Sequence, residues 1–181
     1  MDLFLYGLLI VAVLLGLWFI STMNRFRVLQ VKINEALSGI DVALTKRFDV
    51  LTKMWDLAKK YMEYEQSTLE KVVKLRQGAK ATVSDQQELN QGLNEMASQL
   101  NVVLEQYPEL RATENMKELQ RSVRDVEEHL QAARRLYNAN VSTFNQSIIV
   151  FPNSVVANAI KATKADFFEA EDRKRTDVTF N

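Results

Sequence analysis

The chain has 181 residues, and its 23 basic and 23 acidic side chains leave no net charge at pH 7. Because phosphate neutralisation drives nucleic-acid binding, a chain with no basic excess or basic stripe is not expected to bind nucleic acid. The absence of cysteine excludes disulfides and thiolate metal ligands and fits a reducing compartment.

An uncharged run fills residues 3–24, between Asp2 and Arg25. As a helix rising about 1.5 Å per residue, it is long enough to cross a hydrocarbon core of roughly 30 Å. A cleavable signal peptide would add a positive n-region and an A-x-A cleavage site, and both are missing here. Residues 1–24 are therefore predicted to be a permanent transmembrane anchor.

Positive charge lies on one side of this predicted span, at Arg25, Arg27 and Lys32. Short flanking segments rich in lysine and arginine tend to stay on the cytoplasmic side of a membrane. We therefore expect the N-terminus outside and residues 25–181 in the cytoplasm. An alternative role for the same three residues is to bind anionic lipid headgroups, although a persuasive cluster contains more charges.

The residues after the span predict long helices. Apolar or tolerated positions recur about every 3.6 residues from Leu29 to Arg76, which predicts one long helix over 25–77. Gly78 suits a C-terminal cap and Ser84 an N-cap, so a second helix is expected over 85–106. Pro108 ends that helix.

A third helix is expected over 113–150, with Thr113 as its N-cap. Pro152 breaks it, and Ser154 begins a short fourth helix that extends to about residue 164. The predicted fold is therefore all-α: an N-terminal transmembrane helix followed, in residues 25–165, by an elongated antiparallel bundle of three long helices plus a short fourth. A charged tail, residues 166–181, is expected to pack partly on the bundle or to end in disorder.

Residues for catalysis or metal binding are few. His129 is the only histidine, so a hydrolase would need a nucleophile beside it, and no transition-metal ligand set is apparent. Gly-x-Ser-x-Gly and glycine-rich phosphate loops are absent. The sequence therefore predicts no enzyme, no cofactor and no metal site.

Asn138 and Asn145 lie seven residues apart on one side of the third predicted helix, next to a core face that includes Tyr137. One interpretation is that they fix the register between helices. The alternative is a polar groove that binds a partner or a peptide. Arg134 and Arg135 are interpreted first as a solvated face and second as a site for acidic headgroups or carboxylates.

The same segment carries a family resemblance. RRLYNANVSTFN at residues 134–145, followed by FP at 151–152, resembles the C-terminal signature of the LemA family of bacterial membrane proteins. Motifs at residues 36–51, 105–112, 166–170 and 178–180 extend this resemblance over nearly all of the chain after the span. The sequence departs from the family pattern at residues 159–165, which lack the glycine common before the tail, and at residues 51–55, which lack the usual proline. The resemblance implies a single span and a helical bundle, and it supplies no reaction.

The expected function is that of a membrane-anchored helical interaction or scaffold protein. It would act through protein–protein contacts or self-assembly at the bacterial inner membrane, with the lipid bilayer and a protein partner or a second copy as its partners. The periodicity leaves open whether the stripes pack within one chain or between chains. The alternative is an adaptor or sensor that binds a peptide or small ligand between helices and regulates a membrane enzyme.

Overall fold

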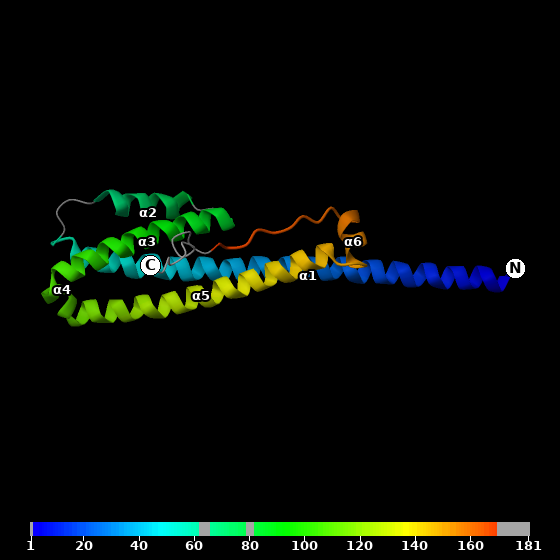
Figure 1. The fold of residues 1–181 in the computed structure, drawn as a ribbon, viewed down its shortest axis with the longest axis horizontal. Coiled ribbons are helices and arrows are strands. Elements are labelled where there is room, and N and C mark those ends of the chain that lie inside the picture. The colour runs from blue at the N-terminus through cyan, green and yellow to red at the C-terminus, as the bar shows by residue number, and fades with distance from the viewer. Residues whose placement is uncertain (1, 62–65, 79–81, 170–181) are drawn as a thin grey trace, which may run out of the picture.

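A computed structural model describes residues 2–61, 66–78 and 82–169 (Figure 1). All regular secondary structure within these ranges is helical, which confirms the predicted all-α fold. The helices, in chain order, are α1 (Asp2–Ala58), α2 (Gln66–Gly78), α3 (Val83–Gln106), α4 (Pro108–Ala112), α5 (Glu114–Ile149) and α6 (Asn153–Ala159).

Helix α1 is 57 residues long and continues without a break from the uncharged run into the bundle (Figure 1). Its side chains from Phe4 to Leu17 are exposed, whereas Phe26, Leu29 and Ile33 are buried. It is the one helix among the described residues that is long and apolar enough to cross a membrane. A single helix therefore forms both the candidate span and one wall of the bundle.

The prediction of one continuous helix over 25–77 is wrong, because two separate helices cover this range. Helix α1 ends at Ala58, where N–H groups of Lys59 and Tyr61 bond to the carbonyls of Trp55 and Ala58, both at 2.8 Å. Helix α2 is a separate helix and packs against α3, where its Val72 is fully buried. Met62 and Glu65, which the predicted stripe included, lie outside the described residues. A mean spacing cannot separate one helix from two when the inward positions keep the same average step.

Helices α2 and α3 form a closely packed antiparallel pair (Figure 1). A Cβ added to Gly92 on α3 would lie 3.1 Å from Leu75 Cδ1 of α2, so the absent side chain is what permits this approach. The N-cap of α3 is Thr82 rather than the predicted Ser84, because Thr82 Oγ1 accepts the Asp85 N–H at 3.2 Å.

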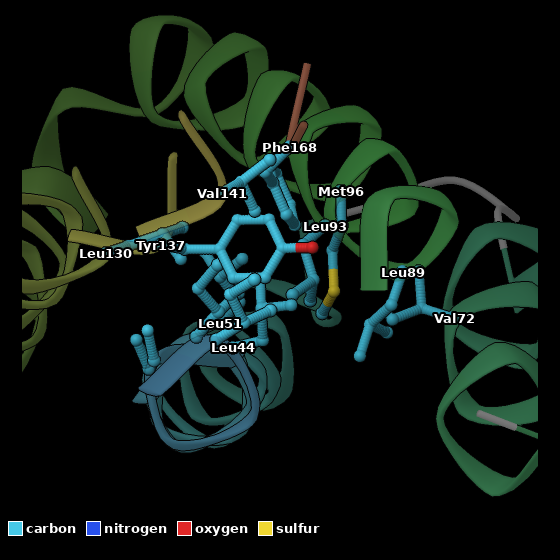
Figure 2. Close-up of a cluster of buried hydrophobic side chains, with 14 of the residues drawn as sticks. Leu44, Leu51, Val72, Leu89, Leu93, Met96, Leu130, Tyr137, Val141 and Phe168 are labelled. Carbon is cyan, nitrogen blue, oxygen red and sulfur yellow. The ribbon is translucent and has the colours of Figure 1, made fainter. Parts of the chain in front are cut away.

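Helices α1 and α5 run antiparallel along most of the bundle, and α3 lies beside them (Figure 1). At one end of this pair the rings of Phe26 and Phe144 meet edge to face, with centroids 6.1 Å apart. The middle of the core is a cluster of apolar side chains from α1, α3 and α5, several of which Figure 2 labels. Its fully buried members include Leu44, Leu51, Leu93, Met96, Leu130, Tyr137 and Val141.

The predicted N-cap of α5 is confirmed, since Thr113 Oγ1 accepts the Met116 N–H. The fourth helix is shorter than predicted. It begins at Asn153 with Pro152 at its N-cap and ends at Ala159, and residues 162–169 form no regular secondary structure and run as an extended trace (Figure 1). Lys161 ends the turn with φ at 53°, a left-handed conformation that costs a side-chain-bearing residue about 1–2 kcal/mol. This explains why a glycine suits the stretch between α6 and the tail.

Candidate interaction site

Residues 162–169, hereafter the C-terminal strap, run back from α6 along α5 (Figure 1). Asn145 holds the strap at Ala165: its Nδ2 donates to the Ala165 carbonyl, and its Oδ1 accepts the Ala165 N–H, both at 2.9 Å. Asn138 makes the same pair of bonds with Phe168, at 3.0 Å to the carbonyl and 2.8 Å from the N–H. Each asparagine thus satisfies both polar groups of one residue's main chain.

A further hydrogen bond holds the strap between Ala165 and Phe168, the two residues that the asparagines bind. The Tyr137 hydroxyl donates to the Asp166 carbonyl at 2.9 Å. The side chain of Phe168 is buried and belongs to the same apolar cluster as Tyr137 and Val141 (Figure 2). The guanidinium carbon of Arg134 lies 5.0 Å from the centroid of the Phe168 ring, within the range of a cation–π contact.

This arrangement holds an extended segment of main chain against α5. The amide side chains of Asn138 and Asn145, seven residues apart on α5, bond to main-chain atoms, so these bonds do not depend on the side chains of the strap. The side chain of Phe168 is the one in the strap that is buried in the bundle.

The structure gathers Arg134, Tyr137, Asn138 and Asn145 around the strap and leaves the other predicted site residues apart. Arg135 is exposed on the surface of α5. Arg25, Arg27 and Lys32 are exposed on α1, just past the uncharged run, and the Lys32 carbonyl accepts a bond from Asn140 Nδ2 at 3.0 Å. His129 is also exposed on α5. Within the described residues no group of three or more His, Cys, Asp or Glu side chains is placed to hold a metal ion.

A buried charged residue was missed by the sequence analysis. Arg47 on α1 is only 5% exposed; its Nη1 donates to Asn90 Oδ1 on α3 at 2.9 Å, and its Nη2 lies 2.6 Å from Glu127 Oε1 on α5. It therefore joins the three long helices of the bundle. The signal was present in the sequence, because Arg47 stands three residues after Leu44 and four before Leu51, on the buried face of the stripe.

The pKa of Tyr137 is raised above its ordinary value of 10.0, mainly by burial and also by the nearby Asp166 carboxylate. Since the folded state holds this proton more tightly than the unfolded chain, its stabilising contribution is complete below pH 10 and is lost as the pH rises through the folded pKa. We expect the stability difference between the native protein and Tyr137→Phe to be about 1 kcal/mol at pH 8 and to shrink at pH 10–11. Denaturant unfolding of both proteins at each pH measures this difference, and a constant difference would contradict the assignment.

The geometry defines a class of protein, an all-helical bundle. Its first helix begins with a long apolar segment, and its C-terminal strap is held against α5 by hydrogen bonds. The chain belongs to the LemA family, since the model of that family matches residues 36–181. It is similar to Protein LemA of Metamycoplasma hominis, with 30% identity over 152 residues that cover 82% of this chain and 69% of that protein. Family membership and the apolar helix together support a membrane-associated protein.

Proposed function

We propose that this protein is a membrane-anchored interaction protein, which acts by binding and not by catalysis at the bacterial inner membrane. Its N-terminus lies outside, and residues 25–181 lie in the cytoplasm, as the positions of Arg25, Arg27 and Lys32 favour. In this proposal α1 fixes the bundle at the membrane, and the bundle presents its outer helical faces to a second copy or another protein.

The observation that carries this proposal is the outer face of α1. Val28, Val31 and Val42 are each more than half exposed, and helical spacing places them opposite the core residues Leu29 and Ile33. These valines follow the exposed apolar residues of the span on α1, on a face that also carries the exposed Arg27 and Glu35. Lateral contact along α1 would bury both surfaces at once, which favours association of copies within the membrane plane.

The mass of the full-length protein in a mild detergent tests self-association. We expect a defined oligomer, and we expect the double variant Val28→Ser and Val31→Ser to shift it toward the monomer. Val102→Ser is the matched control, because Val102 is an equally exposed valine on α3. A native protein that is monomeric at every concentration would contradict self-assembly.

A second candidate function rests on the surface of α5 that holds the strap. Asn138 and Asn145 bond to main-chain atoms alone, so a segment of a membrane enzyme could take the place of the strap and make the same bonds. The protein would then be an adaptor that senses or regulates that enzyme. A monomeric full-length protein whose strap is displaced by an added extended peptide containing a phenylalanine would favour this function over the scaffold.

A further inference from the structure

Four apolar side chains are exposed where α5 turns into α6, and we call them the apolar corner. They are Ile149, Val150, Phe151 and Val155, and Phe151 is 78% exposed. Exposing neighbouring side chains of this kind to water is unfavourable, because burial of each large apolar side chain would stabilise the protein by roughly 1.5–3 kcal/mol. Ile149, Val150 and Phe151 are consecutive in sequence and Val155 follows on α6, and none of the four makes the hydrogen bonds that hold the strap, which come from Tyr137, Asn138 and Asn145.

The apolar corner lies beside the end of the candidate span. Helix α6 packs on both α1 and α5 (Figure 1). On α1 the run of exposed side chains ends at Leu17. The next two residues, Trp18 and Phe19, pack partly against the core, and Thr22 is buried. The bundle therefore begins within the last turns of the uncharged run, and α6 is the element of the bundle placed at that level.

The length of the span places this level at the membrane interface. A hydrocarbon core of roughly 30 Å takes about 20 helical residues, so a span that starts at residue 3 reaches its far boundary near Thr22. Arg25 and Arg27 follow directly on α1, and Lys161 and Lys164 are exposed just after α6. Basic side chains therefore flank the apolar corner at the depth where lipid headgroups lie.

We propose that the apolar corner is a second membrane-contact site that inserts into the interface of the bilayer beside the span. The partner it fits is a lipid surface with anionic headgroups: the four apolar side chains enter the acyl boundary, and Arg25, Arg27, Lys161 and Lys164 meet the phosphates. The inference rests on the proposed anchoring by α1. Two contacts would hold the bundle at a fixed rotation about the membrane normal, which a single helix does not.

Spin labels measure the depth of this corner directly, and the absence of native cysteine makes single-cysteine variants simple to prepare. Full-length Phe151→Cys and Val155→Cys carry a nitroxide in vesicles of phosphatidylethanolamine and phosphatidylglycerol. Leu14→Cys reports the span, and Val102→Cys is the matched control for an exposed apolar residue elsewhere in the bundle. Collision with oxygen reports lipid, and collision with a water-soluble nickel complex reports solvent.

We expect labels at 151 and 155 to be oxygen-accessible and shielded from nickel, as at 14, while the label at 102 is accessible to nickel. Labels at 151 and 155 in solvent, with the label at 14 in lipid, would overturn the second contact and leave the anchor intact. A label at 14 in solvent would overturn the anchoring itself. Labels at 151 and 155 shielded from both reagents would show that protein covers the corner, which also overturns the proposal.

Discussion

Asn138→Ala and Asn145→Ala are each expected to release the C-terminal strap from α5. Each substitution removes two hydrogen bonds, to Phe168 or to Ala165, and the strap has few other polar contacts. At about 1–1.5 kcal/mol for each bond, the loss is about 2–3 kcal/mol for each variant. Amide hydrogen exchange of the strap in the full-length protein should therefore accelerate roughly 30- to 160-fold.

Two further variants make this result specific. Asn140→Ala removes one hydrogen bond from the same helix to the Lys32 carbonyl, and strap exchange should stay at its native rate. Asn138→Asp keeps an acceptor for the Phe168 N–H but places a carboxylate against the Phe168 carbonyl, so it should release the strap as alanine does. Native exchange rates in Asn138→Ala would mean that its two hydrogen bonds to Phe168 do not hold the strap in place.

Arg47→Met is expected to cost about 1–3 kcal/mol of unfolding free energy, the usual penalty for leaving a buried polar group such as Asn90 unpaired, because the Glu127 carboxylate is one third exposed and can be solvated. The methionine fills part of the space, but it leaves Asn90 without its donor and Glu127 without its counter-charge. Since Asn90 is buried, water cannot replace the lost bond without opening the interface of α1 and α3. Denaturant unfolding of the full-length protein measures the change.

Lys71→Met is the matched control, because Lys71 and Glu95 form an ion pair at 2.8 Å with both side chains about half exposed. Screening by solvent limits this pair to less than about 1 kcal/mol. The triple variant Arg47→Met, Asn90→Leu, Glu127→Leu should recover most of the loss, since it leaves no polar group of the network unpaired. Equal effects of Arg47→Met and Lys71→Met would show that the buried network adds nothing to stability.

The sequence predicted the helices well wherever burial is periodic. Leu29, Ile33, Ile40 and Leu51 are buried as the stripe on α1 required, and the turn at Pro108 ends α3 at the expected residue. The end of α1 at Ala58 could not be predicted in this way. No proline or glycine marks it, and the packing of α2 on α3 depends on contacts between distant residues.

The sequence singled out Asn138, Asn145 and Tyr137 but gave no sign of the segment that they contact. Asn138, Asn145 and Tyr137 were conspicuous because polar groups beside an apolar helix face need hydrogen bonds. Residues up to about 164 were expected in the fourth helix and residues 166–181 in a charged tail, and neither interpretation of the asparagines linked them to that segment, whereas Asn145 holds Ala165. An extended segment whose main chain bonds to side chains leaves no periodic pattern, so its position follows only from the folded bundle.

Because α1 runs without a break from the candidate span into the bundle, the bundle would tilt together with the span. A span adapts to bilayer thickness by tilting, and a helix with no hinge between span and bundle passes that tilt to everything attached to it. The part of α1 beyond the span is about 50 Å long, so a change of about 10° would move its far end, near α4, by roughly 9 Å. In the proposed anchored state, the height of the strap and of α4 above the membrane would therefore change with the thickness of the bilayer.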